Sequence, residues 1–129
     1  MSTNLIIPPS HPEYPVSPLP KLKNDRYRKV RGGSAEFLTL FCAKCSGFVL
    51  LYQKDGPGRL LRCYLNRIFA PSSLEALQYD RRFQQPGDLP ALKCSHCAKL
   101  MGVPMRYDDG RLAYRLVPGS FYKRKAIDA

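Results

Sequence analysis

The chain has 129 residues, 44% of them hydrophobic, and a formal net charge of +11. This length gives room for one domain, and the charge favours a polyanionic partner such as nucleic acid or the ribosome. The longest apolar run, residues 48–52, is too short to cross a membrane. The first ten residues show neither the charged start nor the apolar stretch of a secretion signal. We therefore expect a cytoplasmic protein with reduced thiols and no membrane partner.

Residues 1–35 are predicted to form an arm outside the folded domain. Six of the twelve prolines lie in residues 1–20, where they remove amide donors and favour polyproline II structure. Residues 21–31 carry six lysines or arginines against one aspartate, and the Gly-Gly-Ser segment at 32–34 indicates a hinge. We interpret this part as a Pro-rich and then basic extended arm, disordered when free. It is either a plain linker or an arm that becomes ordered on RNA or on a protein partner.

Residues 36–120 have the composition of a folded domain, and residues 121–129 are predicted to be a basic C-terminal tail. The strands of the domain are expected to form two hairpins, each after a Cys-x-x-Cys motif and each with an Asp-Gly turn. These strands are predicted at residues 48–53, 59–68, 100–107 and 111–117. A short helix is predicted to begin at Ser72 and to end near Tyr79. The predicted fold class is therefore mostly β (a small α+β domain), with two knuckle-hairpin units around one metal.

Four cysteines form two Cys-x-x-Cys pairs, and 48 residues separate the pairs. They are Cys42, Cys45, Cys94 and Cys97. A Cys-x-x-Cys pair at a turn presents two sulfurs on one side, and two such pairs complete the tetrahedral sulfur shell that Zn²⁺ prefers. We predict one structural Zn²⁺ at these residues, which would change the net charge to about +9. Disulfides and a redox or iron role remain alternatives, because paired thiolates also suit those roles.

The remaining cysteine, Cys63, lies on the apolar face of an alternating segment at 59–65, which favours a buried thiol over a nucleophile. A complete sulfur shell leaves the metal no position for water or substrate, which removes Lewis-acid chemistry. The chain has two histidines, and no motif pairs either of them with a nucleophile. We therefore expect no enzymatic activity.

The segments FCAKC-SGF and KCSHC-AKLMG, each leading into a predicted hairpin, resemble the knuckles of zinc-ribbon proteins. Their wide separation is also similar to that in the β-tent group, which includes the Yippee-like proteins and the B-type methionine sulfoxide reductases. The resemblance covers about residues 37–117. It implies a β-rich zinc fold without a specific family or activity, because the fold hosts many functions.

The function predicted from these features is RNA binding by a non-enzymatic, zinc-stabilised basic module, with the ribosome as a candidate partner. Basic side chains suit phosphate contacts, and tyrosine suits base stacking. The expected contacts are Lys21, Lys23, Arg26, Arg28, Lys29, Arg31, Arg62, Tyr64, Arg67, Arg81 and Arg82. The alternative is a protein-interaction adaptor, in which Pro-rich residues 8–20 dock on a partner and zinc stiffens the scaffold.

Overall fold

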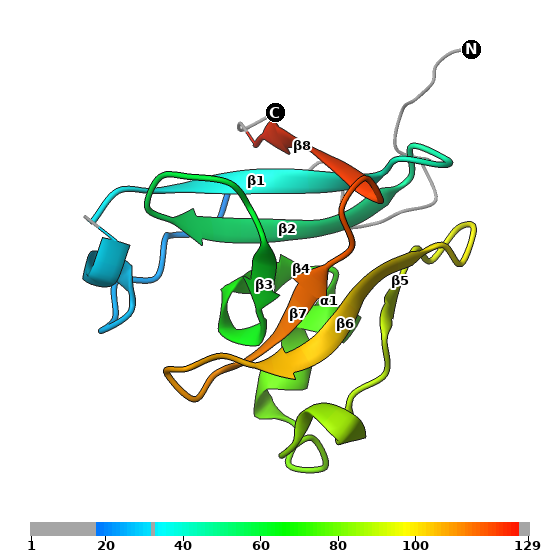
Figure 1. Cartoon of the computed structure of the whole chain (residues 1–129). Helices are drawn as coiled ribbons and strands as arrows, with labels where there is room; N and C mark the ends of the chain where they lie inside the picture. The colour runs from blue at the N-terminus through cyan, green and yellow to red at the C-terminus, as the bar shows by residue number, and fades with distance from the viewer. Residues whose placement is uncertain (1–17, 32, 127–129) are drawn as a thin grey trace.

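The chain forms two four-stranded antiparallel sheets that share one core, as described by a computed structural model for residues 18–31 and 33–126 (Figure 1). Sheet A has the strand order β4-β2-β1-β8, and sheet B has the order β3-β7-β6-β5. The strands of sheet A are β1 (Ala35–Cys42), β2 (Phe48–Asp55), β4 (Ile68–Ala70) and β8 (Phe121–Lys125). The strands of sheet B are β3 (Arg62–Tyr64), β5 (Leu92–Lys93), β6 (Leu100–Arg106) and β7 (Leu112–Leu116).

The helical structure is short and lies mainly between β4 and β5. The elements are α1 (Ser72–Glu75) and the 3₁₀ turns η1 (Arg28–Arg31), η2 (Leu65–Arg67), η3 (Ala76–Tyr79) and η4 (Pro86–Asp88). The predicted fold class is confirmed, because strands predominate and the helix predicted from Ser72 is present. No helix in the described part of the chain is long and apolar enough to span a membrane.

Each Cys-x-x-Cys motif is itself the turn of a hairpin. The first motif joins β1 to β2, which pair with Leu40 opposite Leu50, and the second joins β5 to β6, which pair with Lys93 opposite Leu100. The second hairpin predicted from the sequence, β6–β7, is confirmed, with Arg106 opposite Leu112.

The segment at 59–68 does not return beside β2 as one strand, as the sequence had indicated. It divides into β3, which pairs with β7 in sheet B, and β4, which pairs with β2 in sheet A. The buried side chains of Leu60, Cys63 and Leu65 all enter the core between the sheets. Burying these three side chains in one core requires the chain to leave sheet A after the loop at 56–58 and to cross to sheet B.

The segment predicted to be a basic C-terminal tail begins with a strand of sheet A. β8 pairs with β1, and Cys42 is opposite Phe121. Alternating side chains of β8 therefore project on opposite faces of the sheet, so its basic residues are held at fixed positions.

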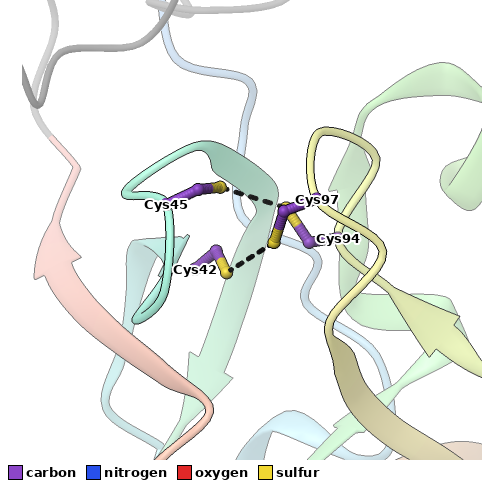
Figure 2. A group of neighbouring side chains, drawn as sticks. All are labelled: Cys42, Cys45, Cys94 and Cys97. Carbon is purple, nitrogen blue, oxygen red and sulfur yellow. Dashed lines mark hydrogen bonds between the residues drawn. The ribbon is translucent and has the colours of Figure 1, made fainter.

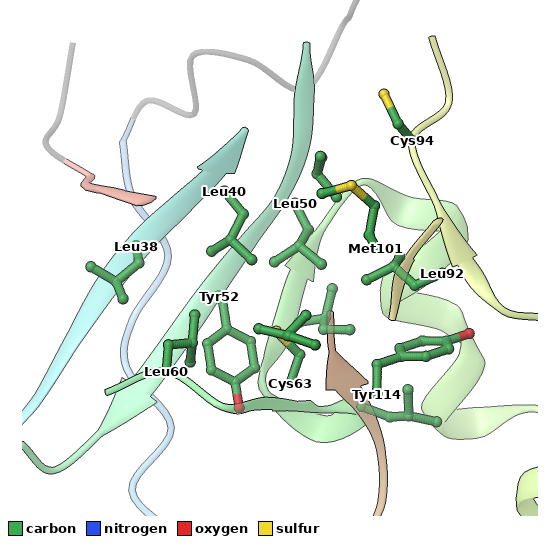
Figure 3. Packing of buried hydrophobic residues seen from close by; sticks show 14 of the residues in the cluster. Leu38, Leu40, Leu50, Tyr52, Leu60, Cys63, Leu92, Cys94, Met101 and Tyr114 are labelled. Carbon is green, nitrogen blue, oxygen red and sulfur yellow. The ribbon is translucent and has the colours of Figure 1, made fainter. Parts of the chain in front are cut away.

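The central core fills the space between the two sheets (Figure 3). Leu38 and Leu40 of β1 and Leu50 of β2 meet Met101 of β6 and Tyr114 of β7 there, and all five side chains are buried. A second apolar cluster lies on the outer face of sheet A. It consists of the buried residues Phe37, Phe41, Phe48, Leu51 and Ala70, with Leu19 and Leu22 packed against them.

Residues 18–31, which we call the N-terminal strap, pack on the domain, whereas the sequence indicated a free arm. Besides Leu19 and Leu22, the strap contributes a reciprocal hydrogen-bonded pair. The backbone amide of Lys23 donates to Oε1 of Gln53 at 2.7 Å, and Nε2 of Gln53 donates to the carbonyl of Lys23 at 3.0 Å. Gln53 is fully buried and its Nε2 also donates to Asp55 at 2.9 Å, so the strap supplies the remaining partners of a buried side-chain amide. The Pro-rich segment at 1–17 lies outside the described residues.

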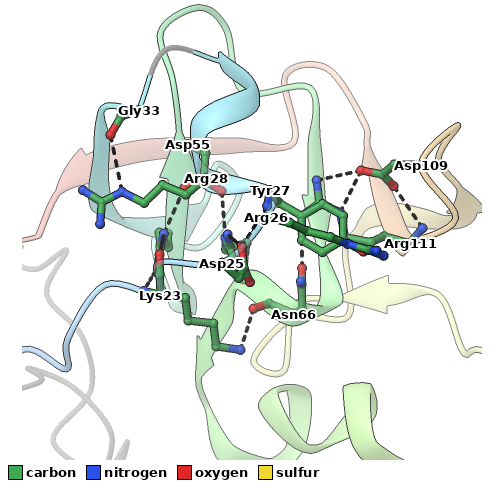
Figure 4. A network of polar contacts seen from close by, with 12 residues as sticks. Lys23, Asp25, Arg26, Tyr27, Arg28, Gly33, Asp55, Asn66, Asp109 and Arg111 are labelled. Carbon is green, nitrogen blue, oxygen red and sulfur yellow. Dashed lines mark hydrogen bonds and ion pairs between the residues drawn. The ribbon is translucent and has the colours of Figure 1, made fainter.

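A buried arginine, Arg67, fixes the strap by bonding Asp25 and Asp55, two of the residues that Figure 4 labels. Arg67 is 0% exposed, and its two terminal nitrogens donate to Asp25 of the strap at 2.6 and 2.9 Å. Its Nε donates to Asp55 at the end of β2 at 2.7 Å. The hydrogen bonds from Arg67 lower the pKa of Asp25 to about 2. This pairing therefore stabilises the fold above the ordinary aspartate pKa of about 3.9, and the contribution is lost as the pH falls towards 2.

We predict that Asp25→Asn lowers the free energy of unfolding by about 1–3 kcal/mol, because Arg67 would keep its buried charge and lose one of two carboxylate partners. Thermal or urea denaturation of the metal-loaded protein measures the change. Asp80→Asn is the matched control, since Asp80 pairs with Arg82, whose side chain is 80% exposed, and such pairs contribute little. Equal stability of Asp25→Asn and the wild type would show that the Asp25–Arg67 pair does not stabilise the fold.

Candidate metal centre and basic surface

The two Cys-x-x-Cys turns have the same backbone structure. In the first, the amide of Ser46 donates to the carbonyl of Cys42 at 2.8 Å, and in the second the amide of Ala98 donates to the carbonyl of Cys94 at 2.8 Å. Ser46 and Ala98 both adopt a left-handed conformation, with φ of 64° and 65°. The two turns therefore present their cysteines in equivalent ways, although only the cysteines and their spacing are shared in sequence.

The four cysteine sulfurs form one cluster between the sheets (Figure 2). Sγ of Cys42 lies 3.6 Å from Sγ of Cys97, and Sγ of Cys45 lies 3.5 Å from Sγ of Cys94. All four sulfurs lie within 4.8 Å of one another. Four sulfurs at about 2.3 Å from one zinc ion would be roughly 3.8 Å apart. The donor set and its dimensions fit one tetrahedrally bound metal ion, consistent with a zinc-ribbon-like module.

Backbone amides are directed at the sulfurs and favour their thiolate forms. The amides of Lys44, Gly47 and His96 lie 3.4 Å from the sulfurs of Cys42, Cys45 and Cys94, respectively. The backbone amide of Lys99 lowers the pKa of Cys97, whereas burial raises the pKa values of Cys45 and Cys94. Four adjacent thiolates would repel one another strongly, so a bound cation is the arrangement that best accommodates them.

The two turns also pack closely against each other. A side chain at Gly47 would place its Cβ 2.4 Å from a ring carbon of His96 and 3.2 Å from Sγ of Cys45. Gly47 therefore gives the second turn the space to approach the first. His96 packs against this glycine, and its ring is not part of the sulfur cluster.

Cys63 is separate from the cluster. It is fully buried in the core, and burial raises the pKa of its thiol. This environment agrees with the expected buried thiol and disfavours the nucleophilic thiolate.

A cluster of tyrosines and arginines lies at the end of the molecule opposite to the sulfurs. β2 and β6 both begin at a Cys-x-x-Cys turn, so their far ends, with the loop at 56–58 and the turn at 107–111, lie roughly 20–25 Å away along the strands. The guanidinium of Arg111 lies between two rings, 3.8 Å from the centroid of Tyr27 and 3.7 Å from that of Tyr64. Arg62 covers Tyr107 at 4.4 Å. The strap thus meets sheet B through a stack of alternating rings and guanidinium groups.

A cavity of about 180 Å³ is walled by this cluster and by the loop after β2. Arg111 is neutralised by Asp109, at 2.9 Å, but Arg59 and Arg62 form no ion pair within residues 18–31 and 33–126. The cavity therefore combines aromatic walls with uncompensated positive charge.

The structure brings some of the predicted RNA contacts together at this cavity and separates others. Arg62 and Tyr64 line the cavity, and Arg26 lies beside it on the ring of Tyr27. Lys21 and Lys29 are exposed on the strap. Arg81 and Arg82 are exposed in the loop before η4, away from the cavity lining.

Several of the predicted contacts are held by structural partners, and the prediction for Arg67 was wrong. Arg67 cannot reach an RNA, because it is buried between Asp25 and Asp55. Nζ of Lys23 donates to the carbonyl of Asn66 at 2.7 Å, and Nε of Arg28 donates to the carbonyl of Gly33 at 3.3 Å. The side chain of Arg31 lies outside the described part of the chain.

Sequence reasoning did not identify Tyr27, Tyr107 and Arg111 as members of one site. Tyr107 and Arg111 flank the β6–β7 turn, where the amide of Tyr107 donates to the carbonyl of Arg111 at 2.9 Å. The hairpin register could have placed these two side chains together. The sequence contains no local signal for the position of Tyr27, because it depends on the packing of the strap.

Comparisons with known proteins identify no relative. No protein-family model, curated protein or solved structure matches the chain. The functional argument therefore depends on the residues themselves.

We predict about one metal ion per chain in elemental analysis of protein purified without added metal, and loss of that ion in Cys94→Ser. The core of this variant should unfold, because the binding free energy of a structural metal, about 10–16 kcal/mol in small zinc domains, is comparable with or larger than the stability of such a domain. Cys63→Ala should keep the metal and lose only about 1 kcal/mol for the small cavity. A metal-free Cys94→Ser protein that unfolds cooperatively like the wild type would contradict the assignment.

Proposed function

We propose that this protein is a non-enzymatic RNA-binding module whose fold is stabilised by one structural Zn²⁺. The observation that carries the proposal is the cavity opposite the metal, where tyrosine rings lie beside Arg59 and Arg62, which have no carboxylate partner in the described residues. Single-stranded RNA is bound in this way by other proteins, with bases stacked on aromatic rings or guanidinium planes and phosphates held by arginine.

The size of the cavity supports contact with one base rather than enclosure of a whole ligand. Its volume of about 180 Å³ is below the roughly 300–1,000 Å³ of pockets that enclose drug-sized ligands. The stacked arrangement of Tyr27, Arg111 and Tyr64 also orders these side chains before binding, which reduces the entropy cost of the interface.

The proposed ion is Zn²⁺ because four cysteine sulfurs in a closed shell are typical of structural zinc sites. Iron is the competing ion for such a shell, and elemental analysis distinguishes the two. A closed shell leaves the metal no position for a substrate, which is the reason to propose that the protein is not an enzyme. The cytoplasm would keep the thiols reduced, and the ribosome is a candidate source of the RNA.

We predict that the affinity for a single-stranded RNA oligomer falls steeply with salt, and that Arg62→Ala reduces the slope of log K against log salt by about one for each lost phosphate contact. Tyr64→Ala should weaken binding by about 1–3 kcal/mol with little change in slope, because stacking releases no counterions. Tyr64→Phe, which keeps the ring, should bind like the wild type. Fluorescence anisotropy at several salt concentrations measures all four proteins.

Heparin provides the control for charge alone. Equal affinity for heparin and RNA, with no effect of Tyr64→Ala, would contradict the proposal and leave the adaptor alternative as the leading one. The proposed docking segment of that alternative, residues 8–20, lies almost wholly outside the described residues.

A further inference from the structure

A second cavity, of about 440 Å³, lies beside the first at the start of β1 and the end of β2. Its walls include Lys54 of β2, Lys123 and Lys125 of β8, and Glu36 of β1. We call it the lysine cleft. It shares Lys54, Pro57 and Gly58 with the tyrosine-walled cavity, so the two hollows adjoin at this loop.

Strand register explains why the lysines face the cleft. Lys123 lies opposite Leu40 and Lys125 lies opposite Leu38 in the β1–β8 pair. Residues that are opposite each other in a sheet project on the same face, and Leu38 and Leu40 point into the core between the sheets. The two lysines therefore project on the inner face of sheet A, but at its edge strand, where both remain exposed.

The uncompensated charge in the cleft is that of the two lysines of β8. Lys54 lies opposite Glu36 in the β1–β2 pair, and its Nζ donates to the carbonyl of Gly56. Lys123 and Lys125 make no ion pair within the described residues. Lys123 and Lys125 thus bring positive charge to a hollow that is open at Gly58, where an added Cβ would meet nothing within 4 Å.

Lysines on an edge strand also serve to prevent edge-to-edge aggregation. That role would be served equally by basic residues on either face of the strand. Arg124 provides the comparison, because it lies between the two lysines in sequence but projects on the other face, 5.7 Å from the ring centroid of Tyr122. The face therefore distinguishes a protective role from a binding role.

We propose that the lysine cleft binds phosphate groups, and specifically the backbone phosphates next to the base held in the tyrosine-walled cavity. The identity of the ligand as RNA rests on the proposed function. The binding of phosphate groups by the cleft does not depend on it. Because the two hollows adjoin at the loop at 56–58, an RNA held at the tyrosine cluster can extend past this loop to the edge strand β8.

The test compares three single variants that each remove one positive charge from β8: Lys123→Gln, Lys125→Gln and Arg124→Gln. The probes are a single-stranded RNA oligomer and inorganic tripolyphosphate, which carries phosphates without bases. Metal content and melting temperature are measured first to establish that each variant is folded. Binding is then measured by anisotropy for the RNA and by calorimetry for tripolyphosphate.

Lys123→Gln and Lys125→Gln should each weaken binding of both probes about three- to tenfold and reduce the RNA salt slope by about one. Arg124→Gln should change both affinities less than twofold. Equal effects of all three variants would overturn the proposal, because they would indicate only net charge.

The remaining outcomes separate the cleft from the proposed function. If the two lysine variants affect tripolyphosphate while the wild type does not bind RNA, the cleft stands as a phosphate site and the RNA proposal fails. If Arg62→Ala and Tyr64→Ala weaken RNA binding while the lysine variants bind both probes like the wild type, RNA binding stands and the cleft proposal fails.

Discussion

The four cysteine sulfurs are the constraint on which the arrangement of the two sheets depends. They join the β1–β2 turn of sheet A to the β5–β6 turn of sheet B, with 48 intervening residues that contain β3, β4 and all of the helical structure after η1. A metal at this point closes a long loop, which reduces the entropy of the unfolded chain. Four thiolates at these distances repel one another unless they share a cation. Metal binding and folding are therefore thermodynamically linked.

The opposite end of the two sheets has no metal and is joined by the strap. Arg67 lies in η2, between β3 of sheet B and β4 of sheet A, and it bonds Asp25 of the strap and Asp55 of sheet A. Arg111 of the β6–β7 turn is stacked on Tyr27 of the strap. A buried ion pair contributes less to stability than its short distances suggest, because both charges lose hydration. Its main effect here is to favour one position of the strap, since another position would leave the buried Arg67 without one of its two carboxylate partners.

The features that could be predicted from the sequence are those determined by neighbouring residues. The spacing of Cys42 and Cys45 and of Cys94 and Cys97 predicted the sulfur cluster, and the Asp-Gly turn predicted the β6–β7 hairpin. The first hairpin was wrong because the pattern at 59–68 is compatible with pairing in either sheet, and the choice depends on burial of Cys63 and Leu65 in a core that the pattern does not describe.

The wrong prediction for Arg67 has the same cause, because Arg67 also lies in the segment at 59–68. It shows how an error in secondary structure leads to an error in a predicted binding residue. In the segment after Cys63, the alternation of side chains predicts a strand that continues to Ile68, with Arg67 next to the exposed face that carries Arg62. The 3₁₀ turn η2 at Leu65–Arg67 breaks that alternation and directs Arg67 inwards. A basic residue is therefore evidence for a nucleic-acid contact only after its acidic partners are known. Here Asp25 and Asp55 lie 42 and 12 residues away in the sequence.

The strap is part of both the fold and the proposed binding site. Docking of the strap and binding of a ligand are therefore coupled. Asp25 holds the strap on the domain, and two residues later Tyr27 forms a wall of the cavity. A ligand that contacts Tyr27 binds only the form in which the strap is docked, so it must stabilise that form by mass action. The reverse also holds: any change that releases the strap removes one wall of the cavity and leaves Arg111 with a single stacked ring, on Tyr64. A metal bound at the cysteines, roughly 20–25 Å away along the strands, would influence this cavity only through the sheets that it aligns. Among the described residues, the aromatic walls and two arginines without an acidic partner, Arg59 and Arg62, lie where the strap closes the end of the sheets opposite the cysteines.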